Sequence, residues 1–287
     1  MRRKLIIGLC ILVVLLAGIG IYLRNGFYGN CVLERRSLYV RSGSEYRTLE
    51  DSLDAAIAHT AFFRFYARHI ELDRSFKPGH YVLEPGMNIV QVARMLKLGL
   101  QTPVRVTINN VRTPAQLAGK LARQIEADSA TIVGALTDPA TARKAGFDSV
   151  TLFSMFIPDT YEFYWTVSPA QFIERMRREY DRFWTPQRDA KRQRSGLSRL
   201  EVMTLASIVY EETRQSDEMP RIAGVYINRL RKGWPLQADP TVKYALQEFG
   251  LRRILHRHLK YPSPYNTYIN KGLPPSPICI CLLYTSP

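Results

Sequence analysis

Acidic residues and cysteines are both scarce in this chain of 287 residues. The 25 Asp and Glu residues are outnumbered by 40 Lys and Arg, which gives a formal net charge of +15. That excess suits nucleic acid, an anionic membrane surface or another acidic polymer equally well. The 4 cysteines do not suggest a disulfide framework, because they are spread between the two ends of the chain. Cys279-x-Cys281 lacks His or acidic neighbours, so we predict neither a metal nor a cofactor.

Low-complexity tracts are also missing, and 46% of the residues are hydrophobic, so the chain can bury a sizeable core. Its length predicts one large or two modest domains. Much of the basic excess lies between Arg175 and Arg194. We interpret this run as the solvated face of a long helix rather than as a ligand patch.

A long uncharged run is present at the N-terminus. Leu5 to Leu23 holds 19 residues without a charge, which is enough to cross a bilayer as a helix. Arg2, Arg3 and Lys4 precede it, so the positive-inside rule places residues 1–4 in the cytoplasm. The run has no small-x-small cleavage site, and we expect an uncleaved anchor with the rest of the chain outside. Nucleic acid is then excluded as a partner.

The pattern after the anchor predicts a linker over residues 24–44, with one strand near Ser37–Arg41, and a small αβ module over residues 45–100. In the module, residues 49–72 have the spacing of two short helices, and a Pro-Gly turn leads into a strand. Asn88 is placed to cap a helix that ends at Gly99.

Residues 101–287 predict a mostly helical, mixed α/β domain, so the fold class is α+β. Val104–Ile108 alternates as a strand, and the aromatic stretch Met155–Trp165 is core by default, although its rings beside acids also suit carbohydrate. Prolines after Gly250 predict a looped surface. The helices are expected over 114–126, 129–136 and 139–145, after Ser168-Pro169, from near Ser198, after Met219-Pro220, and from Asp239 to near Gly250.

One helical stretch, Leu205–Thr213, carries two adjacent glutamates. At about 100° per residue, Glu212 falls between Leu205 and Ile208 on the apolar face, and Glu211 lies about a quarter-turn away. A glutamate on an apolar stripe is costly unless it is paired or held protonated for a purpose. A structural partner is the more common explanation, so this stretch alone leaves both readings open.

A set of ordered motifs resembles one known family. It looks like the catalytic domain of the endolytic murein transglycosylases, the YceG-like family, and two further landmarks lie upstream. The resemblance covers nearly the whole chain. The motifs are PDTY at 158–161 and FKPGHYVLEPGMNIVQVARMLKLG at 76–99 upstream, then LASIVYEET, VYINRL, LQADPTV, YNTY and GLPP in that order.

The resemblance implies a single-pass inner-membrane enzyme with a LysM-like module at 45–100 and a periplasmic catalytic domain at 101–287. Such an enzyme cleaves MurNAc-β-1,4-GlcNAc bonds within nascent glycan strands, leaves 1,6-anhydro-MurNAc ends and terminates glycan elongation. Its implied partners are peptidoglycan strands, the membrane and peptidoglycan synthases. The likeness fades after Pro275, and residues 278–287 do not look like the family's continuation, so we expect an incomplete catalytic domain.

The resemblance also implies that Glu212 is the catalytic residue, because the family's catalytic glutamate directly precedes Thr. The chain departs from the motif at two neighbouring positions, where Tyr210 replaces Glu and Glu211 replaces Lys. A lytic transglycosylase needs a single carboxyl group that is first acid and then base, unlike the two-carboxylate hydrolases. We expect the neighbouring apolar residues to desolvate Glu212 and keep it protonated, and Glu211 to be a bystander.

Further motif residues are candidates for binding the glycan. Polar side chains suit sugar hydroxyl and N-acetyl groups, aromatic rings suit stacking on a pyranose, and Arg229 suits a carboxylate from Asp239 or from the lactyl-peptide stem. Asp239 is alternatively a helix cap, or a second carboxylate if the enzyme hydrolyses, and Asn228 is alternatively a loop cap. The candidates are Asn228, Arg229, Gln237, Asp239, Tyr265, Asn266, Thr267 and Tyr268.

Two other functions remain open at this point. One is a membrane-anchored peptidoglycan-binding scaffold without chemistry, which would not need Glu212. The other is a basic surface protein that binds anionic lipid or a teichoic-type polymer, and its binding should collapse as salt is added.

Overall fold

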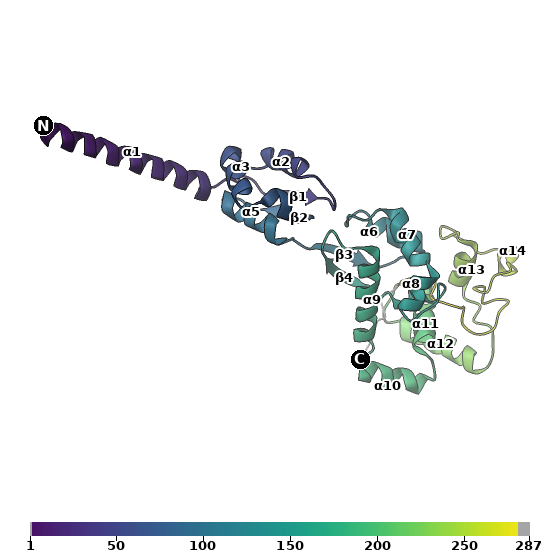
Figure 1. Ribbon diagram of the computed structural model, residues 1–287. Helices are drawn as coiled ribbons and strands as arrows, with labels where there is room; N and C mark the ends of the chain where they lie inside the picture. Colours follow the sequence, from purple (N-terminus) through teal and green to yellow (C-terminus); the bar gives the residue numbers. More distant parts are fainter. Residues whose placement is uncertain (1, 281–287) are drawn as a thin grey trace. The chain divides into compact units, whose positions relative to one another are not determined.

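The computed structural model describes residues 2–280 and divides the chain into two compact units. The first unit contains residues up to Val104 together with Tyr164–Thr166, and the second contains Arg105–Phe163 and the chain from Val167 onward. The fold is mixed α+β and mostly helical, as the sequence predicts (Figure 1).

An apolar helix opens the first unit. Helix α1 runs over Arg2–Tyr28. Within its part Ile6–Tyr28, the most apolar stretch of 18 residues has a mean hydropathy of 2.9, and none of that stretch is buried. By length and composition it is able to cross a membrane. The helix contains the predicted span Leu5–Leu23 and continues for five residues beyond it.

The small module that follows has two antiparallel strands, and each expected helix and strand is present. Its core includes Leu53, Tyr81 and Leu96, each fully buried. Strand β1 pairs with β2 so that Leu38 lies opposite Tyr81. The elements are β1 (Arg36–Val40), α2 (Tyr46–Asp54), α3 (Thr60–His69), α4 (Leu72–Ser75), β2 (Gly79–Leu83) and α5 (Ile89–Leu98).

Helix α5 shows how local chemistry sets its bounds. The Asn88 side chain accepts a hydrogen bond from the Gln91 backbone N–H at 2.9 Å, and the Gln91 side chain accepts one from the Asn88 N–H at 3.0 Å. This capping box starts the helix. Gly99 ends it with φ at 69°, a left-handed conformation that glycine adopts without steric cost. Both predicted ends are confirmed.

The segment between α1 and β1 is tied to the module over residues 31 and 32, although the sequence predicted a linker there. The Cys31 N–H donates to the Met87 carbonyl at 2.9 Å, and the Ala58 N–H donates to the Cys31 carbonyl at 2.7 Å. Cys31 and Val32 are buried in the module core. Only two residues, Gly29 and Asn30, therefore separate the end of α1 from the first fixed residue of the module.

The second unit is built mainly of helices around a two-stranded sheet of β3 and β4. Two helices end earlier than predicted, since α6 stops at Leu121 and α13 at Leu246, where Gln247 turns left-handed. The elements are β3 (Val104–Ile108), α6 (Pro114–Leu121), α7 (Ser129–Thr137), α8 (Pro139–Lys144), the short 3-10 helix η1 (Leu152–Met155), β4 (Asp159–Phe163), α9 (Pro169–Phe183), α10 (Pro186–Ser195), α11 (Arg199–Glu212), α12 (Met219–Arg231), α13 (Asp239–Leu246) and α14 (His256–Leu259).

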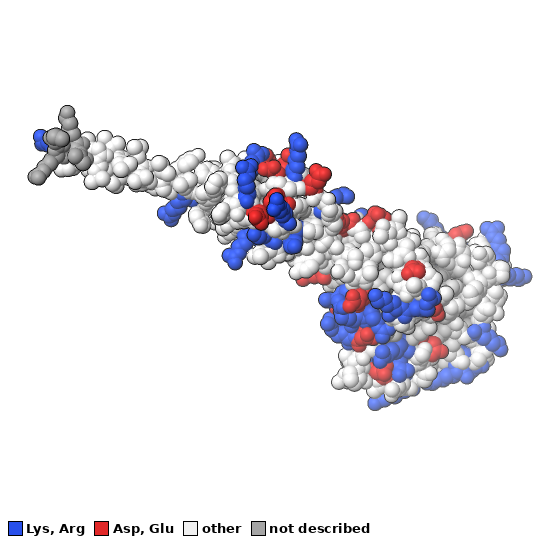
Figure 2. All heavy atoms as spheres, viewed as in Figure 1, with Lys and Arg blue, Asp and Glu red and all other residues white. Residues whose placement is uncertain are grey.

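The basic run between Arg175 and Arg194 forms two helices rather than one long helix, because Thr185-Pro186 starts α10 with a new cap. Its arginines are exposed or half-buried, and several pair with acidic residues one turn away, such as Arg178 with Glu174 at 2.8 Å. Figure 2 shows basic and acidic atoms interspersed on the visible face. The prediction of a solvated face agrees with these ion pairs, which contribute little individually.

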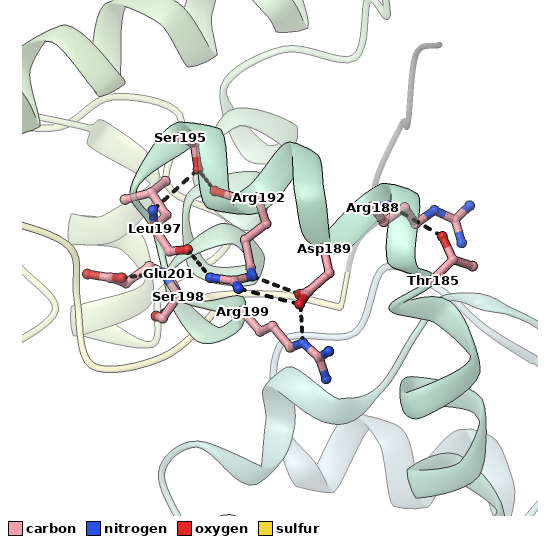
Figure 3. A network of polar contacts seen from close by, with 9 residues as sticks. All are labelled: Thr185, Arg188, Asp189, Arg192, Ser195, Leu197, Ser198, Arg199 and Glu201. Atoms are coloured by element: carbon pink, nitrogen blue, oxygen red, sulfur yellow. Dashed lines mark hydrogen bonds and ion pairs between the residues drawn. The ribbon is translucent and has the colours of Figure 1, made fainter.

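A polar network joins the end of α10 to the start of α11 (Figure 3). The Asp189 carboxylate accepts hydrogen bonds from Arg192 Nε at 2.8 Å and Arg199 Nε at 3.1 Å. Arg192 also donates to the Leu197 carbonyl at 2.8 Å. These two guanidinium groups lower the pKa of Asp189 to about 2. The network holds the turn from which α11 begins.

The chain after α14 contains little helix, as predicted, but its last described residues are not a surface loop. Ile278, Cys279 and Ile280 are buried, the Ile278 N–H donates to Ser207 Oγ at 3.0 Å, and Ile280 forms a bridge with Val111. The prediction of a looped surface is wrong for this segment, because apolar residues follow the prolines and pack into the domain. Residues 281–287, which include Cys281, lie outside the described residues.

Candidate functional site

The candidate site begins with helix α11, whose apolar face builds the core beneath it. Ser198 and Glu201 form a capping box at its start, as the sequence predicts. Leu205, Ile208 and Val209 are buried and pack in one cluster with Tyr226 of α12. The helix ends at Glu212, and Thr213 is its C-cap residue.

Glu212 is exposed, so the expectation that apolar neighbours desolvate it is wrong. The helical phase of Glu212 matches the apolar stripe, but the stripe is covered only up to Val209. Glu212 is the last residue of the helix and extends past the packed core. The hydroxyl of Tyr226 donates a hydrogen bond to Glu212 Oε2 at 3.3 Å. The carboxylate is therefore held by one phenol on an accessible surface.

Glu211 is the more buried of the two acids, although the sequence predicted a bystander. Its side chain is 13% exposed, and Arg112 Nη2 donates to both carboxylate oxygens, at 3.0 Å and 2.9 Å. Arg112 follows β3 and also lies over the Phe249 ring, with its guanidinium carbon 5.2 Å from the centroid. The environment of Glu211 depends on chain segments distant in sequence, which helical phase does not reveal.

The two positions that depart from the family motif are connected through Arg214. Its guanidinium carbon lies 4.3 Å from the centroid of the Tyr210 ring, and its Nη2 lies 3.8 Å from Glu211 Oε1. Glu211 thus lies between two cations, Arg112 and Arg214. This arrangement neutralises the negative charge adjacent in sequence to Glu212.

Two tyrosines border Glu212. Burial, and then the charge of Glu212 and its hydrogen bond, raise the pKa of Tyr226. Tyr226 therefore stays protonated and remains a donor to Glu212. Burial, and then the hydrogen bond and charge of Asp239, raise the pKa of Tyr268 to about 12, with a further contribution from Glu212. The charges of Glu212 and Arg229 affect the pKa of both phenols, which places the two tyrosines within electrostatic range of both groups.

Asp239 and Arg229 lie near these tyrosines, and they do not form an ion pair with each other in the described part of the chain. The Tyr268 hydroxyl donates to Asp239 Oδ1 at 2.6 Å, and Asp239 is exposed in the first turn of α13. The N-cap residue is Ala238, so Asp239 is not the helix cap. Arg229 Nη1 donates to the Leu236 carbonyl and braces the turn before α13.

Two predicted glycan-binding residues are exposed. Asn228 lies on α12 with its side chain at the surface. Gln237 is exposed as well, with φ at 52°, and its backbone N–H donates to the Thr267 carbonyl at 3.1 Å. Their side chains are accessible to a ligand, and the binding function stays a prediction.

Asn266 and Thr267 are buried and bonded to the protein, so their side chains are not exposed as the predicted sugar contacts require; their role in binding stays a prediction. Asn266 Nδ2 donates to the carbonyls of Leu259 at 3.0 Å and Tyr261 at 2.9 Å. Thr267 Oγ1 accepts from the Ala238 N–H at 3.0 Å. A hydroxyl or amide side chain that hydrogen-bonds to the backbone of another loop segment stabilises both segments. The residue type alone does not distinguish this structural role from ligand binding.

Tyr265 also differs from the expectation of a stacking platform. Its ring centroid lies 4.7 Å from that of Tyr244, and its hydroxyl lies 2.6 Å from Ser276 Oγ. Its ring is therefore partly occupied by packing inside the domain. Tyr268 is half-buried, and the charge of Glu212 acts on its hydroxyl.

Sequence reasoning missed two contributors to the site. Neither Tyr226 nor Arg112 is among the residues that the sequence predicts for the site. Spacing along α12 does predict that Tyr226 faces α11, but the use of its hydroxyl depends on where α11 ends. Among residues 2–280, no group of three or more His, Cys, Asp or Glu side chains is placed to hold a metal ion.

Comparisons with known proteins point to one family. Residues 38–282 match the model of the YceG-like family. The chain is similar to a Bacillus subtilis protein named endolytic murein transglycosylase, 27% identical over 75% of this chain and 64% of the relative. It is also similar to a Streptococcus pneumoniae protein of the same name, 24% identical over 83% of this chain and 49% of the relative. The chain thus spans about half to two thirds of these relatives.

A solved structure supports the same relationship. The crystal structure of a yceG-like protein from Listeria monocytogenes is 29% identical, with a TM-score of 0.56, and the match covers 86% of this chain and 87% of that chain.

Proposed function

Because this chain belongs to the YceG-like family, we propose that it is a peptidoglycan lytic transglycosylase in which Glu212 is both acid and base. The observation that carries the proposal is the exposed Glu212 carboxyl group, held by the Tyr226 hydroxyl at the end of α11. The relatives named above are endolytic murein transglycosylases, which supports a glycan substrate.

The proposed reaction cleaves a MurNAc-β-1,4-GlcNAc bond inside a nascent strand. Glu212 donates a proton to the glycosidic oxygen, and the bond from that oxygen to C1 of MurNAc breaks. The resulting carboxylate accepts the proton of the MurNAc C6 hydroxyl as the C6 oxygen attacks C1. The product is a 1,6-anhydro-MurNAc end, formed without water. Such an end stops further elongation of the strand.

Tyr226 is proposed to position the carboxyl group in both steps. Its hydroxyl holds Oε2, which leaves Oε1 for the substrate. The two cations around Glu211 keep the adjacent negative charge from acting on Glu212. Asn228 and Gln237, whose side chains are exposed, and the half-buried Tyr268 are the proposed contacts to sugar.

We also propose that α1 is a single-pass anchor in the inner membrane, with residues 1–4 in the cytoplasm and the remaining chain in the periplasm. Its length, hydropathy and preceding basic residues support this topology. The small αβ module is proposed to be LysM-like and to contact glycan, and peptidoglycan synthases are proposed partners.

The second candidate reaction is hydrolysis, with Asp239 as a second carboxylate. It is kept because the Tyr268 hydroxyl donates to Asp239, and the charge of Glu212 also acts on that phenol. A two-carboxylate mechanism uses water to form a reducing end.

One experiment separates these proposals. The purified full chain is incubated with uncrosslinked glycan strands in ¹⁸O-labelled water, and the masses of the products are measured by mass spectrometry. Lytic transglycosylation gives anhydro ends without ¹⁸O, whereas hydrolysis gives reducing ends that contain it. Glycan that is bound but left intact would instead support the scaffold without chemistry.

A further inference from the structure

The end of α1 does not stand free of the small module. Figure 1 shows it beside α3 and α5, and both helices contact α1. Gly26 of α1 is buried and faces the Phe62 ring of α3. A Cβ atom at position 26 would lie inside the van der Waals distance of that ring. Glycine therefore permits this contact.

Aromatic rings continue outward from this contact. Phe62 meets Tyr22 at 5.3 Å and Phe27 at 5.1 Å between ring centroids, and Phe27 meets Phe65 at 6.0 Å. The outer rings remain open, since Tyr22 is 66% exposed and Phe65 is 68% exposed. Exposed aromatic side chains that gather in one place mark an interaction surface.

The length of α1 places this cluster at a defined depth. Leu5–Leu23 rises about 28 Å at 1.5 Å per residue, close to the roughly 30 Å hydrocarbon core of a bilayer. The next five residues, up to Tyr28, add about 7 Å, which is the approximate thickness of one headgroup layer. Phe27 and Tyr28 then lie among the lipid headgroups.

The charges beside the cluster suit the same environment. Phe65, Arg68 and His69 are all exposed on α3, and their spacing puts them on one face of that helix. Arg24 is exposed at the end of the apolar run. Cations beside aromatic rings at the end of a spanning helix match the composition of the membrane interface, where phosphate groups attract the cations.

We propose that the aromatic cluster of Tyr22, Phe27, Phe62 and Phe65, with the exposed Tyr28 next to Phe27 in the chain, is a membrane-interface surface that seats the small module in the outer headgroup layer of the bilayer. The inference rests on the proposed anchoring by α1 and goes beyond it. An anchor alone would leave the module free to move, whereas this surface, with only Gly29 and Asn30 before the fixed Cys31, sets its depth and orientation.

The test places a fluorophore at the surface. The full-chain Phe65→Trp protein is reconstituted into vesicles of phosphatidylcholine and phosphatidylglycerol that carry bromine near the carbonyl end of the acyl chains. Bromine quenches a nearby indole, so the added emission is expected to be quenched and shifted to the blue. The matched control is Tyr39→Trp, an exposed aromatic of β1 in the same module, which should not be quenched.

Two outcomes are decisive. Stronger quenching of Phe65→Trp than of Tyr39→Trp supports the surface, and equal quenching overturns it. Resistance of the protein to alkaline extraction is measured on the same vesicles. If extraction removes the protein, the proposed anchoring fails; if the protein resists extraction but Phe65→Trp is not quenched, only the interface surface fails.

A second variant tests the contact that orders the cluster. Gly26→Ala in the Phe65→Trp background is expected to reduce the quenching, because the added Cβ displaces the Phe62 ring. Circular dichroism of the vesicle-bound protein checks that the fold is kept. Unchanged quenching would show that the Gly26 contact does not position the surface.

Discussion

The motif region of the second unit has a buried layer and an open layer. In the buried layer, Asn266 and Thr267 bond to backbone groups of neighbouring loop segments. In the open layer, Glu212 and Asp239 present carboxylates beside phenols at the surface. Residues of this one set of motifs therefore have different functions. The buried residues stabilise the loops, and only the exposed residues are accessible to a glycan.

The same division applies to the two adjacent glutamates. Glu211 is paired with Arg112 and contributes to the packing of α11. Glu212 is exposed, and its carboxylate accepts a hydrogen bond from the Tyr226 hydroxyl. Two neighbouring residues at the end of α11 thus differ in role, since Glu211 is a structural acid and Glu212 is the candidate catalytic acid. Four substitutions test this division between buried and exposed polar groups.

The largest effect is expected from Glu212→Gln, which removes the proposed acid and base from the open layer. General acid–base catalysis contributes roughly 10²–10⁴-fold, so glycan cleavage should fall by about that factor. Because Glu212 is exposed, the melting temperature should stay unchanged. The measurements are release of anhydro ends and a thermal melt; a Glu212→Gln protein that still cleaves glycan would rule out this residue as the catalyst.

The next effect is expected from Asn266→Ala in the buried layer. The change leaves the carbonyls of Leu259 and Tyr261 and the N–H of Tyr268 without their side-chain partner. Buried unsatisfied groups cost about 1–3 kcal/mol each, so we expect a loss of about 2–4 kcal/mol in the free energy of unfolding, measured in urea.

The control for this change is Asn228→Ala, an exposed residue on α12, which should alter stability by less than about 0.5 kcal/mol. If Asn266→Ala keeps full stability but loses glycan affinity, Asn266 belongs to the binding layer and the division is wrong there.

A smaller loss is expected from Arg112→Met, which leaves the largely buried Glu211 carboxylate without its main partner. Since both side chains retain some exposure, 21% for Arg112 and 13% for Glu211, we expect a loss of about 1–2 kcal/mol. A double-mutant cycle with Glu211→Gln should show coupling, because the two residues share their hydrogen bonds. Arg178→Met, which removes an exposed pair with Glu174, is the control. Additive losses would argue against the pair as a unit.

The smallest effect is expected from Asp189→Asn in the network between α10 and α11. The pKa of Asp189 is lowered to about 2 by Arg192 and Arg199, against about 3.9 for an unperturbed Asp. Its contribution to stability is therefore present above about pH 4 and is lost as the pH falls towards 2. Melting curves should separate wild type from Asp189→Asn slightly at pH 6 and bring them together near pH 2. A gap that persists at low pH would assign the effect to packing.

Local signals in the sequence predicted the frame of the fold well. Asn88 and Gly99 bound α5 because their capping chemistry acts within a few residues, and Ser198 starts α11 for the same reason. The break at Thr185-Pro186 was missed although its cap signal is also local, because the arginine pattern on both sides suggested a single helix.

The sequence nominates a candidate catalytic residue, but it does not give the environment of that residue. The position of Glu212 before Thr213 points to it by resemblance, and helical phase placed it on the correct face. Its exposure depends on where the packed core stops, and the pairing of Glu211 depends on Arg112, 99 residues away in sequence. The same holds for Asn266, since an amide that closes loops and an amide that binds sugar look alike in sequence.

The attachment of Cys31 to the module core allows the opening rate of the module to be measured. The thiol is fully buried, and burial raises its pKa to about 11. Alkylating reagents attack the thiolate, so Cys31 can react only when its segment leaves the module core, where it is bonded to Met87 and Ala58. The rate of maleimide labelling at this native residue then reports how often the segment of Cys31 and Val32 detaches from the module core, with no introduced probe.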